Sequence, residues 1–148
     1  MSNAYKEMFD RHQKEFNAFP MQFAFSDKQF EEGMARLGLS PDDTDKVYSL
    51  DNTGGFYLRT DAARLREMID RHDKEMKDAI AADPTGEGFI LEMFDYELAN
   101  HEYVVGRDVD STLDALCLEP EDIEKDPRLQ HGLKLAKKRQ IDQLEAEE

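Results

Sequence analysis

The sequence contains a single cysteine, Cys117, and no long run of apolar residues. One cysteine cannot form a disulfide within the chain, which is typical of proteins from a reducing compartment. The first residues lack the apolar segment of a secretory signal, and no later stretch approaches the length of a membrane-spanning helix. We therefore expect a cytoplasmic protein that does not insert into a membrane.

Basic residues are also scarce, since 19 Lys and Arg stand against 34 Asp and Glu and give a formal net charge of -15. An acidic surface repels the phosphates of nucleic acids and anionic lipids, which disfavours ordinary nucleic-acid binding. The expected partner is therefore another protein. The aromatic-rich faces of the predicted helices would also suit a homodimer.

The composition by itself leans toward disorder, because charged residues make up 36% of the chain and the mean hydropathy is -0.77. Nine Phe, five Tyr and seven Met argue for a folded chain, because they recur at helical spacing. A chain of 148 residues is long enough to bury one core. We predict a single acidic domain over residues 1–148, frayed over residues 143–148.

Apolar residues recur every three to four positions in several segments, as in helices with one buried face. The predicted helices cover residues 3–19, 26–37, 60–82, 87–100 and 108–116, with a turn of helix from Glu119 and a last helix from Pro127. Ser26 followed by Gln29 predicts an N-cap. The predicted strands cover residues 21–25, 46–50, 55–59 and 102–105, with a hairpin turn at 51–54. We predict an α+β fold of five to six helices packed on a small, mostly antiparallel sheet of three to four strands.

Two pairs of segments resemble each other within the chain. Residues 7–16 resemble residues 67–76, and residues 37–43 resemble residues 116–122. The first pair repeats the order Asp-Arg-His-x-Lys-Glu, whose charges are spaced to pair along one exposed helix face. An old internal duplication would explain both pairs, although similar helices with similar ends also use similar residues.

Three histidines occupy comparable places on predicted helices. His12 and His72 lie on the apolar stripes of their helices, and His101 follows one turn after Glu97. These four side chains could hold Zn²⁺ or another divalent ion, which would make the chain a metal-binding protein or a metal-dependent enzyme. The alternative is that each histidine is hydrogen-bonded at the edge of the core, because the short ligand spacing of known metal motifs is missing. No catalytic residue and no other cofactor is predicted.

Acidic residues form two groups. The groups consist of Asp42, Asp43 and Asp45, and of Glu119, Glu121, Asp122, Glu124 and Asp126. Rows of carboxylates can imitate a phosphate backbone, so an acidic DNA-mimic inhibitor is a further alternative. Such residues more often serve only to keep a protein soluble.

A resemblance to known proteins rests on residues 23–34, 37–39, 54–61, 96–103 and 112–116, of which 96–103 is the most specific. In these segments the chain resembles a family of small uncharacterised proteins that occurs in gut Firmicutes and on their phages and mobile elements. The chain departs from the family at Cys117, where Gly is expected, and at Val104, where Cys is expected. The resemblance implies a bacterial accessory protein but no activity. It points to Asn100, His101 and Glu102 as a polar patch or a structural corner.

The function predicted from these observations is that of a non-enzymatic accessory or binding protein that interacts with another protein. This prediction requires an exposed apolar groove or dimer face and no convergent polar pocket.

Overall fold

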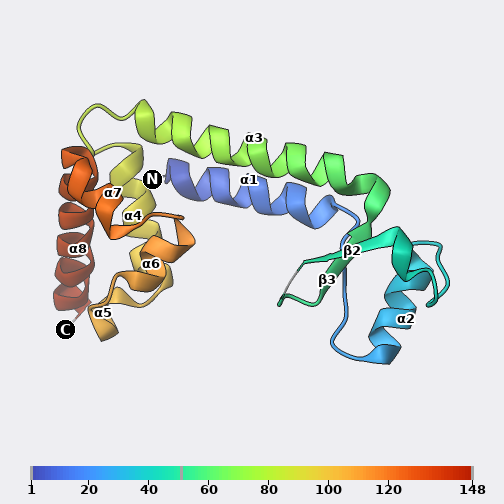
Figure 1. The fold of residues 1–148 in the computed structure, drawn as a ribbon. Helices are drawn as coiled ribbons and strands as arrows, with labels where there is room; N and C mark the ends of the chain where they lie inside the picture. The colour runs from blue at the N-terminus through green and yellow to red at the C-terminus, as the bar shows by residue number, and fades with distance from the viewer. Residues whose placement is uncertain (1, 51, 148) are drawn as a thin grey trace. The chain divides into compact units, whose positions relative to one another are not determined.

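The computed structural model describes residues 2–50 and 52–147. The chain divides into two compact units, and the boundary falls within helices α1 (Ala4–Ala18) and α3 (Ala62–Ala81). Unit 1 contains the described residues up to Arg11 and those from Glu75 onward, and unit 2 contains His12–Lys74 (Figure 1). One cluster of buried apolar side chains lies in unit 1 and another in unit 2, and the buried Met34 and Phe56 of unit 2 lie outside both. The single domain predicted from the sequence stays a prediction.

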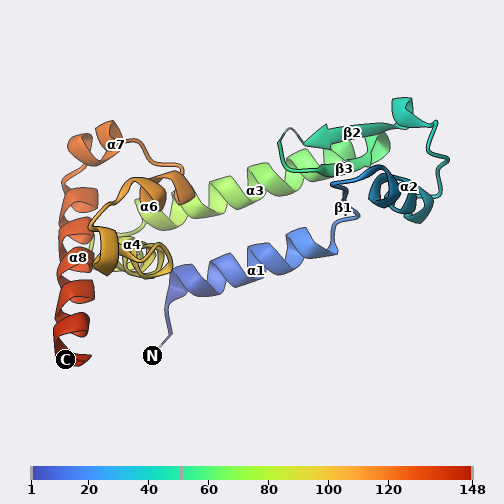
Figure 2. The same cartoon turned by 90° about the horizontal axis from the view of Figure 1, so that it is seen from below.

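Unit 2 is built around a three-stranded antiparallel sheet. Its strands are β1 (Gln22–Phe23), β2 (Val47–Leu50) and β3 (Gly55–Leu58), in the order β1-β3-β2. Helix α2 (Asp27–Arg36) lies beside the sheet (Figures 1 and 2) and packs closely on one face. Gly33 makes this approach possible, because a Cβ atom there would lie 2.6 Å from the Phe56 ring. Short 3-10 helices cover Thr44–Lys46 and Arg59–Asp61.

The ends of α2 follow the predicted signals. The Ser26 hydroxyl accepts a hydrogen bond of 3.2 Å from the N–H of Gln29, which confirms the predicted N-cap. At the other end Gly38 adopts a left-handed φ of 78°, and the N–H of Leu39 donates to the carbonyl of Met34. This pattern is a Schellman motif, in which the left-handed residue satisfies the last helical carbonyls.

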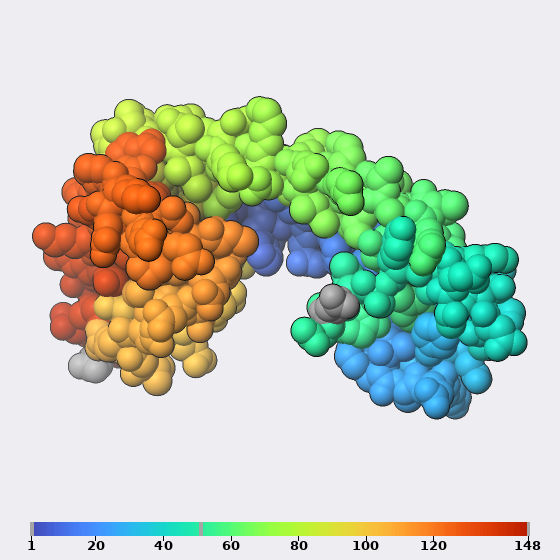
Figure 3. All heavy atoms as spheres, viewed as in Figure 1, coloured from blue at the N-terminus to red at the C-terminus, as the bar shows by residue number. Residues whose placement is uncertain are grey.

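Unit 1 is helical and contains α4 (Phe89–Asn100), α5 (Tyr103–Gly106), α6 (Asp110–Ala115), α7 (Pro120–Lys125) and α8 (Pro127–Glu147). Helix α4 is apolar on most sides and packs along α8, and Figure 3 shows the α6–α8 residues (orange to red) closely packed. The side chains of α4 include the fully buried Phe94, Ile90, Met93 and Leu98. Gly132 of α8 permits the contact, because a Cβ atom there would lie 2.6 Å from Ile90 Cγ2.

A buried carboxylate organises the loop before α4. Asp83 accepts hydrogen bonds from the backbone N–H groups of Thr85, Gly86, Gly88 and Ile90. These bonds hold the pKa of Asp83 below its usual value, although burial opposes them. Arg128 donates to the carbonyl oxygens of Ile80 and Asp83 at 3.0 and 2.6 Å. Asp83 therefore holds the loop before α4 in place, and these hydrogen bonds account for its burial.

The predicted α+β fold and the small antiparallel sheet are confirmed, with eight α-helices among the described residues instead of five to six. The strand predicted at residues 102–105 is wrong, because this segment forms the short helix α5. Glu102 and Arg107 flank α5 with left-handed φ angles of 53° and 57°, which end an extended run. The described residues of unit 1 also contain no strand with which residues 102–105 could pair.

Two predicted segments, the hairpin turn at residues 51–54 and the frayed end at residues 143–148, each include one residue that is not described. Asp51, the first residue of the predicted hairpin turn, and Glu148 are not among the described residues. Helix α8 continues to Glu147, and the fraying of residues 143–148 stays a prediction. Every helix of the described residues is too short or too polar to cross a bilayer.

Candidate functional site

Two of the predicted site residues lie against each other in unit 2. The rings of His12 and His72 stack with their centroids 3.8 Å apart and an interplanar angle of 10°. Nε2 of His72 lies 3.3 Å from Oε1 of Glu15. Burial and the neighbouring His12 lower the pKa of His72, while Glu15 acts in the opposite direction. The lone pairs of stacked imidazoles lie in parallel ring planes, so in this arrangement they do not converge on one ion.

Charged residues of the two similar segments, 7–16 and 67–76, pair between helices within each unit. Arg71 donates to Glu15 of α1 and to Glu67 of its own helix, and in unit 1 Arg11 donates to Glu75 of α3. In the two similar segments Arg11 corresponds to Arg71, and Glu15 corresponds to Glu75. The Arg11–Glu75 pair is therefore the equivalent of the Arg71–Glu15 pair. The resemblance between residues 7–16 and 67–76 therefore has a structural counterpart, in which each segment supplies the ion-pair partner of the other.

The other two predicted ligands lie at the C-terminal end of α4 in unit 1. Glu97 is only 2% exposed, and the Tyr5 hydroxyl donates a hydrogen bond to its carboxylate. Nδ2 of Asn100 lies 3.5 Å from Oε1 of Glu97, and Nε2 of His101 lies 4.0 Å from Oε2. We call these four residues the Glu97 corner.

Burial sets the electrostatics of the Glu97 corner. It raises the pKa of Glu97, and the neighbouring His101 and the hydrogen bonds from Tyr5 and Asn100 offset only part of this shift. Burial and the adjacent Glu97 carboxylate also raise the pKa of Tyr5. A buried carboxyl with a raised pKa beside a histidine is a common feature of functional sites, but structural networks produce it as well.

The predicted polar patch is only partly assembled. Asn100 and His101 join the Glu97 corner, whereas Glu102 is exposed and occupies the left-handed position before α5. Within the described part of the chain, no group of three or more His, Cys, Asp and Glu side chains is arranged to hold a metal ion. His12 and His72 belong to unit 2, and Glu97 and His101 belong to unit 1. The metal site predicted from these four residues stays a prediction.

A surface that the sequence did not predict lies on the face of the sheet opposite α2. The register places Tyr48 beside Tyr57, and Leu50 and Phe23 on either side of Gly55. Ile69 of α3 borders the same surface. We call these residues, Phe23, Tyr48, Leu50, Tyr57 and Ile69, the hairpin face.

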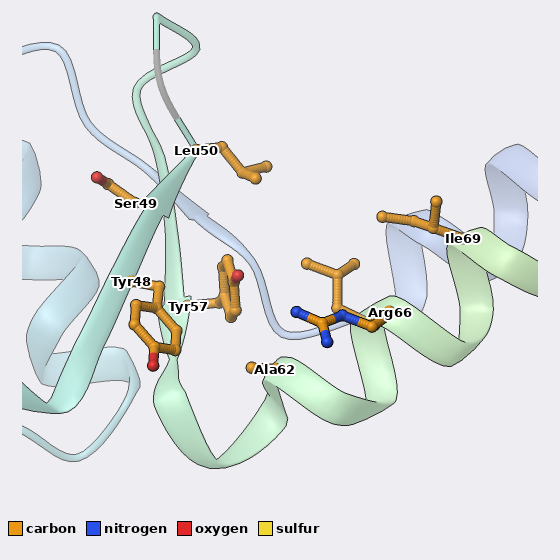
Figure 4. A pocket seen from close by; sticks show the side chains of 8 residues that line it. Tyr48, Ser49, Leu50, Tyr57, Ala62, Arg66 and Ile69 are labelled. Carbon is orange, nitrogen blue, oxygen red and sulfur yellow. The ribbon is translucent and has the colours of Figure 1, made fainter.

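The hairpin face is open and apolar. Tyr48, Phe23 and Ile69 are 44%, 48% and 50% exposed. A groove of about 460 Å³ separates the hairpin from α3, and Figure 4 shows Leu50 and Tyr57 beside it while Ser49 points away. Few monomeric proteins leave such side chains together without a partner.

Two guanidinium groups flank the hairpin face. Arg66 lines the groove, and Cζ of Arg59 lies 4.7 Å from the centre of the Tyr48 ring. Neither arginine forms an ion pair with any residue in the described ranges 2–50 and 52–147. This site thus combines large apolar side chains with positive charges in a chain of net charge -15.

Comparison with protein families matches residues 4–139 to a family of unknown function, DUF7659. The chain belongs to DUF7659. The predicted resemblance to a family of uncharacterised proteins is confirmed, whereas an origin in gut Firmicutes or their phages stays a prediction. The comparison with curated proteins found no match, and the comparison with solved structures found none either.

The family match gives the Glu97 corner and the hairpin face no assigned role. DUF7659 covers both, since residues 4–139 include β1 to β3 and α4. The sequence did contain a signal for the hairpin face. Its predicted strands carry the large apolar residues Phe23, Tyr48 and Leu50, and no predicted helix was assigned to cover them. Strand positions could not show which of these side chains α2 would cover.

Proposed function

We propose that this member of DUF7659 is a non-enzymatic protein-binding module and that the hairpin face is its docking surface. The observation that carries the proposal is the open groove of unit 2, which the exposed Tyr48 and Ile69 line together with Leu50 and Tyr57. Among the described residues, four of the six exposed large apolar side chains lie in unit 2, although it is the smaller unit. Tyrosine and arginine, both present at this groove, are the residues on which protein interfaces most often depend.

The Glu97 corner supports an enzymatic function less well. Its buried carboxylate already has Tyr5 and Asn100 as hydrogen-bond partners. A catalytic carboxyl needs a space in which a substrate can reach it. We interpret the corner as a hydrogen-bonded junction between α1 and the end of α4.

The remaining parts of the proposal follow from the sequence. A cytoplasmic location fits the exposed free thiol of Cys117. An accessory role in a bacterium, phage or mobile element follows the resemblance noted above. The DNA-mimic alternative is weaker, because Asp43 and Asp122 accept hydrogen bonds from the N–H groups of Ser40 and Glu119 and so serve as turn caps.

The test is capture of a partner from cells that express the chain naturally. An Ile69→Asp variant places a charge in the hairpin face and should reduce the captured partner at least tenfold. Because Ile69 is half exposed, the substitution should leave folding intact, which circular dichroism would check.

Val105→Asp is the matched control, since Val105 is 78% exposed and lies in unit 1. It should capture as much partner as the unmodified chain. Equal capture by both variants would remove the hairpin face as the docking surface. A photo-crosslinking residue at position 69, compared with one at position 105, would give the same answer without a change of charge.

A further inference from the structure

The two edges of the sheet in unit 2 differ in a way that bears on what docks there. β1 is an edge strand of only two residues, Gln22–Phe23, and so offers little backbone for pairing with another chain. β2 is the opposite edge and has four residues, Val47–Leu50, without a charge or a proline. None of the described residues pairs with its outer side. Unprotected edges of this kind are templates for an added strand.

The hairpin face lies directly beside the free edge. Tyr48 and Leu50 belong to β2 and point to the face opposite α2, where the groove begins (Figure 4). A strand added along β2 would place every second side chain over this same face. Backbone hydrogen bonds would then hold the segment, and the groove would select its apolar side chains.

The charges beside the groove select the remaining side chains. Arg59 lies beside Tyr48 and Arg66 lines the groove, and neither has a carboxylate partner among the described residues. A guanidinium binds carboxylates through two parallel hydrogen bonds, which favours acidic residues in the added segment.

We propose that the hairpin face binds an extended segment of a partner protein, which adds to β2 as a fourth strand and carries acidic residues beside alternating apolar ones. This inference rests on the proposed function and specifies the partner's chemistry. It commits to a different protein as the occupant, because β2 of a second copy, Val47–Leu50, carries no acidic residue that could meet the arginines beside the groove.

The first experiment selects binders from a random library of ten-residue peptides displayed on phage, with the full-length chain as bait. The expected consensus has aromatic or aliphatic residues at every second position with Asp or Glu nearby. A synthetic peptide of that consensus should slow backbone amide exchange within β2. Selection of basic peptides, selection of helical peptides or no selection at all would overturn the inference.

Charge reversal provides the second measurement. Arg66→Glu should weaken binding of the consensus peptide at least tenfold, and added salt should weaken binding to the unmodified chain. Lys28→Glu is the control, since Lys28 is an exposed cation of α2, the helix on the other face of the sheet, and should change affinity less than twofold. Equal effects of the two substitutions would overturn the role of Arg66.

Two results separate this inference from the proposed function. If Ile69→Asp abolishes capture of the natural partner while β2 amides gain no protection in the complex, the docking surface stands and strand addition is wrong. Sedimentation of the free chain gives the second result. A dimer with protected β2 amides would identify a second copy as the occupant and overturn the proposal of a different partner.

Discussion

The two units of the chain differ in how they use their apolar residues. Among the described residues, eleven buried side chains form the cluster of unit 1. Unit 2 has five buried apolar side chains, of which Phe19, Leu65 and Met68 form a cluster and Met34 and Phe56 lie outside it. Unit 2 instead leaves four large apolar side chains exposed. A small core contributes less free energy of unfolding. The comparison therefore indicates that unit 1 contributes most of the stability and that unit 2 presents an apolar surface.

Charge follows the same division. Unit 1 contains 22 of the acidic residues and 10 of the basic ones, which gives a formal net charge of -12, while the 12 acidic and 9 basic residues of unit 2 give -3. The acidity read from the whole sequence therefore belongs mainly to unit 1. The weaker negative charge of unit 2 is what allows Arg59 and Arg66 to attract an acidic partner.

The largest expected effect tests whether the units differ in stability. Gly132→Ala should destabilise the chain by about 3 kcal/mol, because overpacked core positions cost that much when the neighbours cannot move. The new Cβ atom would lie 2.6 Å from Ile90 Cγ2 and 2.7 Å from the carbonyl oxygen of Gly86. Chemical denaturation followed by circular dichroism measures the loss.

Gly33→Ala is the counterpart in unit 2. Its Cβ atom would meet mainly the Phe56 ring, which can shift, so we expect a loss of about 1 kcal/mol. Hydrogen exchange should show loosening of unit 1 in the first variant and of unit 2 in the second. If either substitution loosened both units equally, the division into a stable unit and a weaker one would fail.

The next effect concerns the Glu97 corner. Glu97→Gln should raise stability at pH 7.5 by about 1 kcal/mol, or about 2–4 °C in Tm, because an amide is buried more easily than a carboxylate and still accepts the Tyr5 hydrogen bond. The raised pKa means that the unfolded chain releases the Glu97 proton first as the pH rises. Stability from this group is therefore complete below the usual glutamate pKa and is lost as the pH rises through the folded value.

Thermal denaturation at pH 4 and pH 7.5 tests this sign. The gain from Glu97→Gln should shrink at the lower pH, since Glu97 is then protonated and already neutral. A loss of stability at pH 7.5 would show that the charged carboxylate stabilises unit 1.

A smaller effect compares two helix ends, one in each unit. Cys117 has a left-handed φ of 56°, and the Schellman bonds around it reproduce those around Gly38, including the bond from the N–H of Leu118 to the carbonyl of Leu113. Cys117→Gly should stabilise the chain by about 0.5–1 kcal/mol, because glycine adopts this conformation without strain.

Gly38→Ala provides the reverse test. It should destabilise by a similar amount, since φ is 78° and no atom lies within 4 Å of the added Cβ, so that strain is the only cost. Opposite signs in the two denaturation curves would confirm that both positions need a left-handed residue. A destabilising Cys117→Gly would mean that the thiol contributes contacts that outweigh the strain.

The smallest expected effect lies at the His12–His72 stack. The pKa of His72 is lowered, so the unfolded chain binds this proton more readily than the folded one. Stability from neutral His72 is complete above the usual imidazole pKa of about 6.5 and is lost as the pH falls from there through the lower pKa of the folded chain. His72→Phe keeps an aromatic ring against His12 but cannot titrate. Its Tm should therefore fall less than that of the unmodified chain between pH 7.5 and 5.5, and an equal fall would contradict the prediction.

Much of the fold could be predicted from local patterns. The periodic spacing in residues 3–19 and 60–82, the Ser26 cap and the turn before Gly55 all correspond to elements of the structure, because each depends on neighbours within a few positions. Residues 102–105 were mispredicted for the complementary reason. Their β-branched composition favours a strand, but a strand also needs a partner that local pattern cannot supply.

The candidate sites were less accessible from the sequence. The spacing of His12 and His72 placed each on an apolar stripe, but only packing brought their rings together and left Glu97 and His101 as a separate pair in the other unit. The hairpin face was missed because exposure depends on which face of the sheet α2 covers. That choice is made at Gly33, which allows α2 to pack closely against Phe56.

The sequence by itself determined the helices and their caps, the hairpin, the net negative charge and the similarity between residues 7–16 and 67–76, since these depend on residue type and short-range spacing. The tertiary structure alone decided that the apolar residues form two clusters, that the repeated arginines and glutamates pair between helices, and that β2 and the hairpin face stay uncovered. Burial depends on which elements meet in space, and many arrangements of amphipathic helices are compatible with the same local pattern.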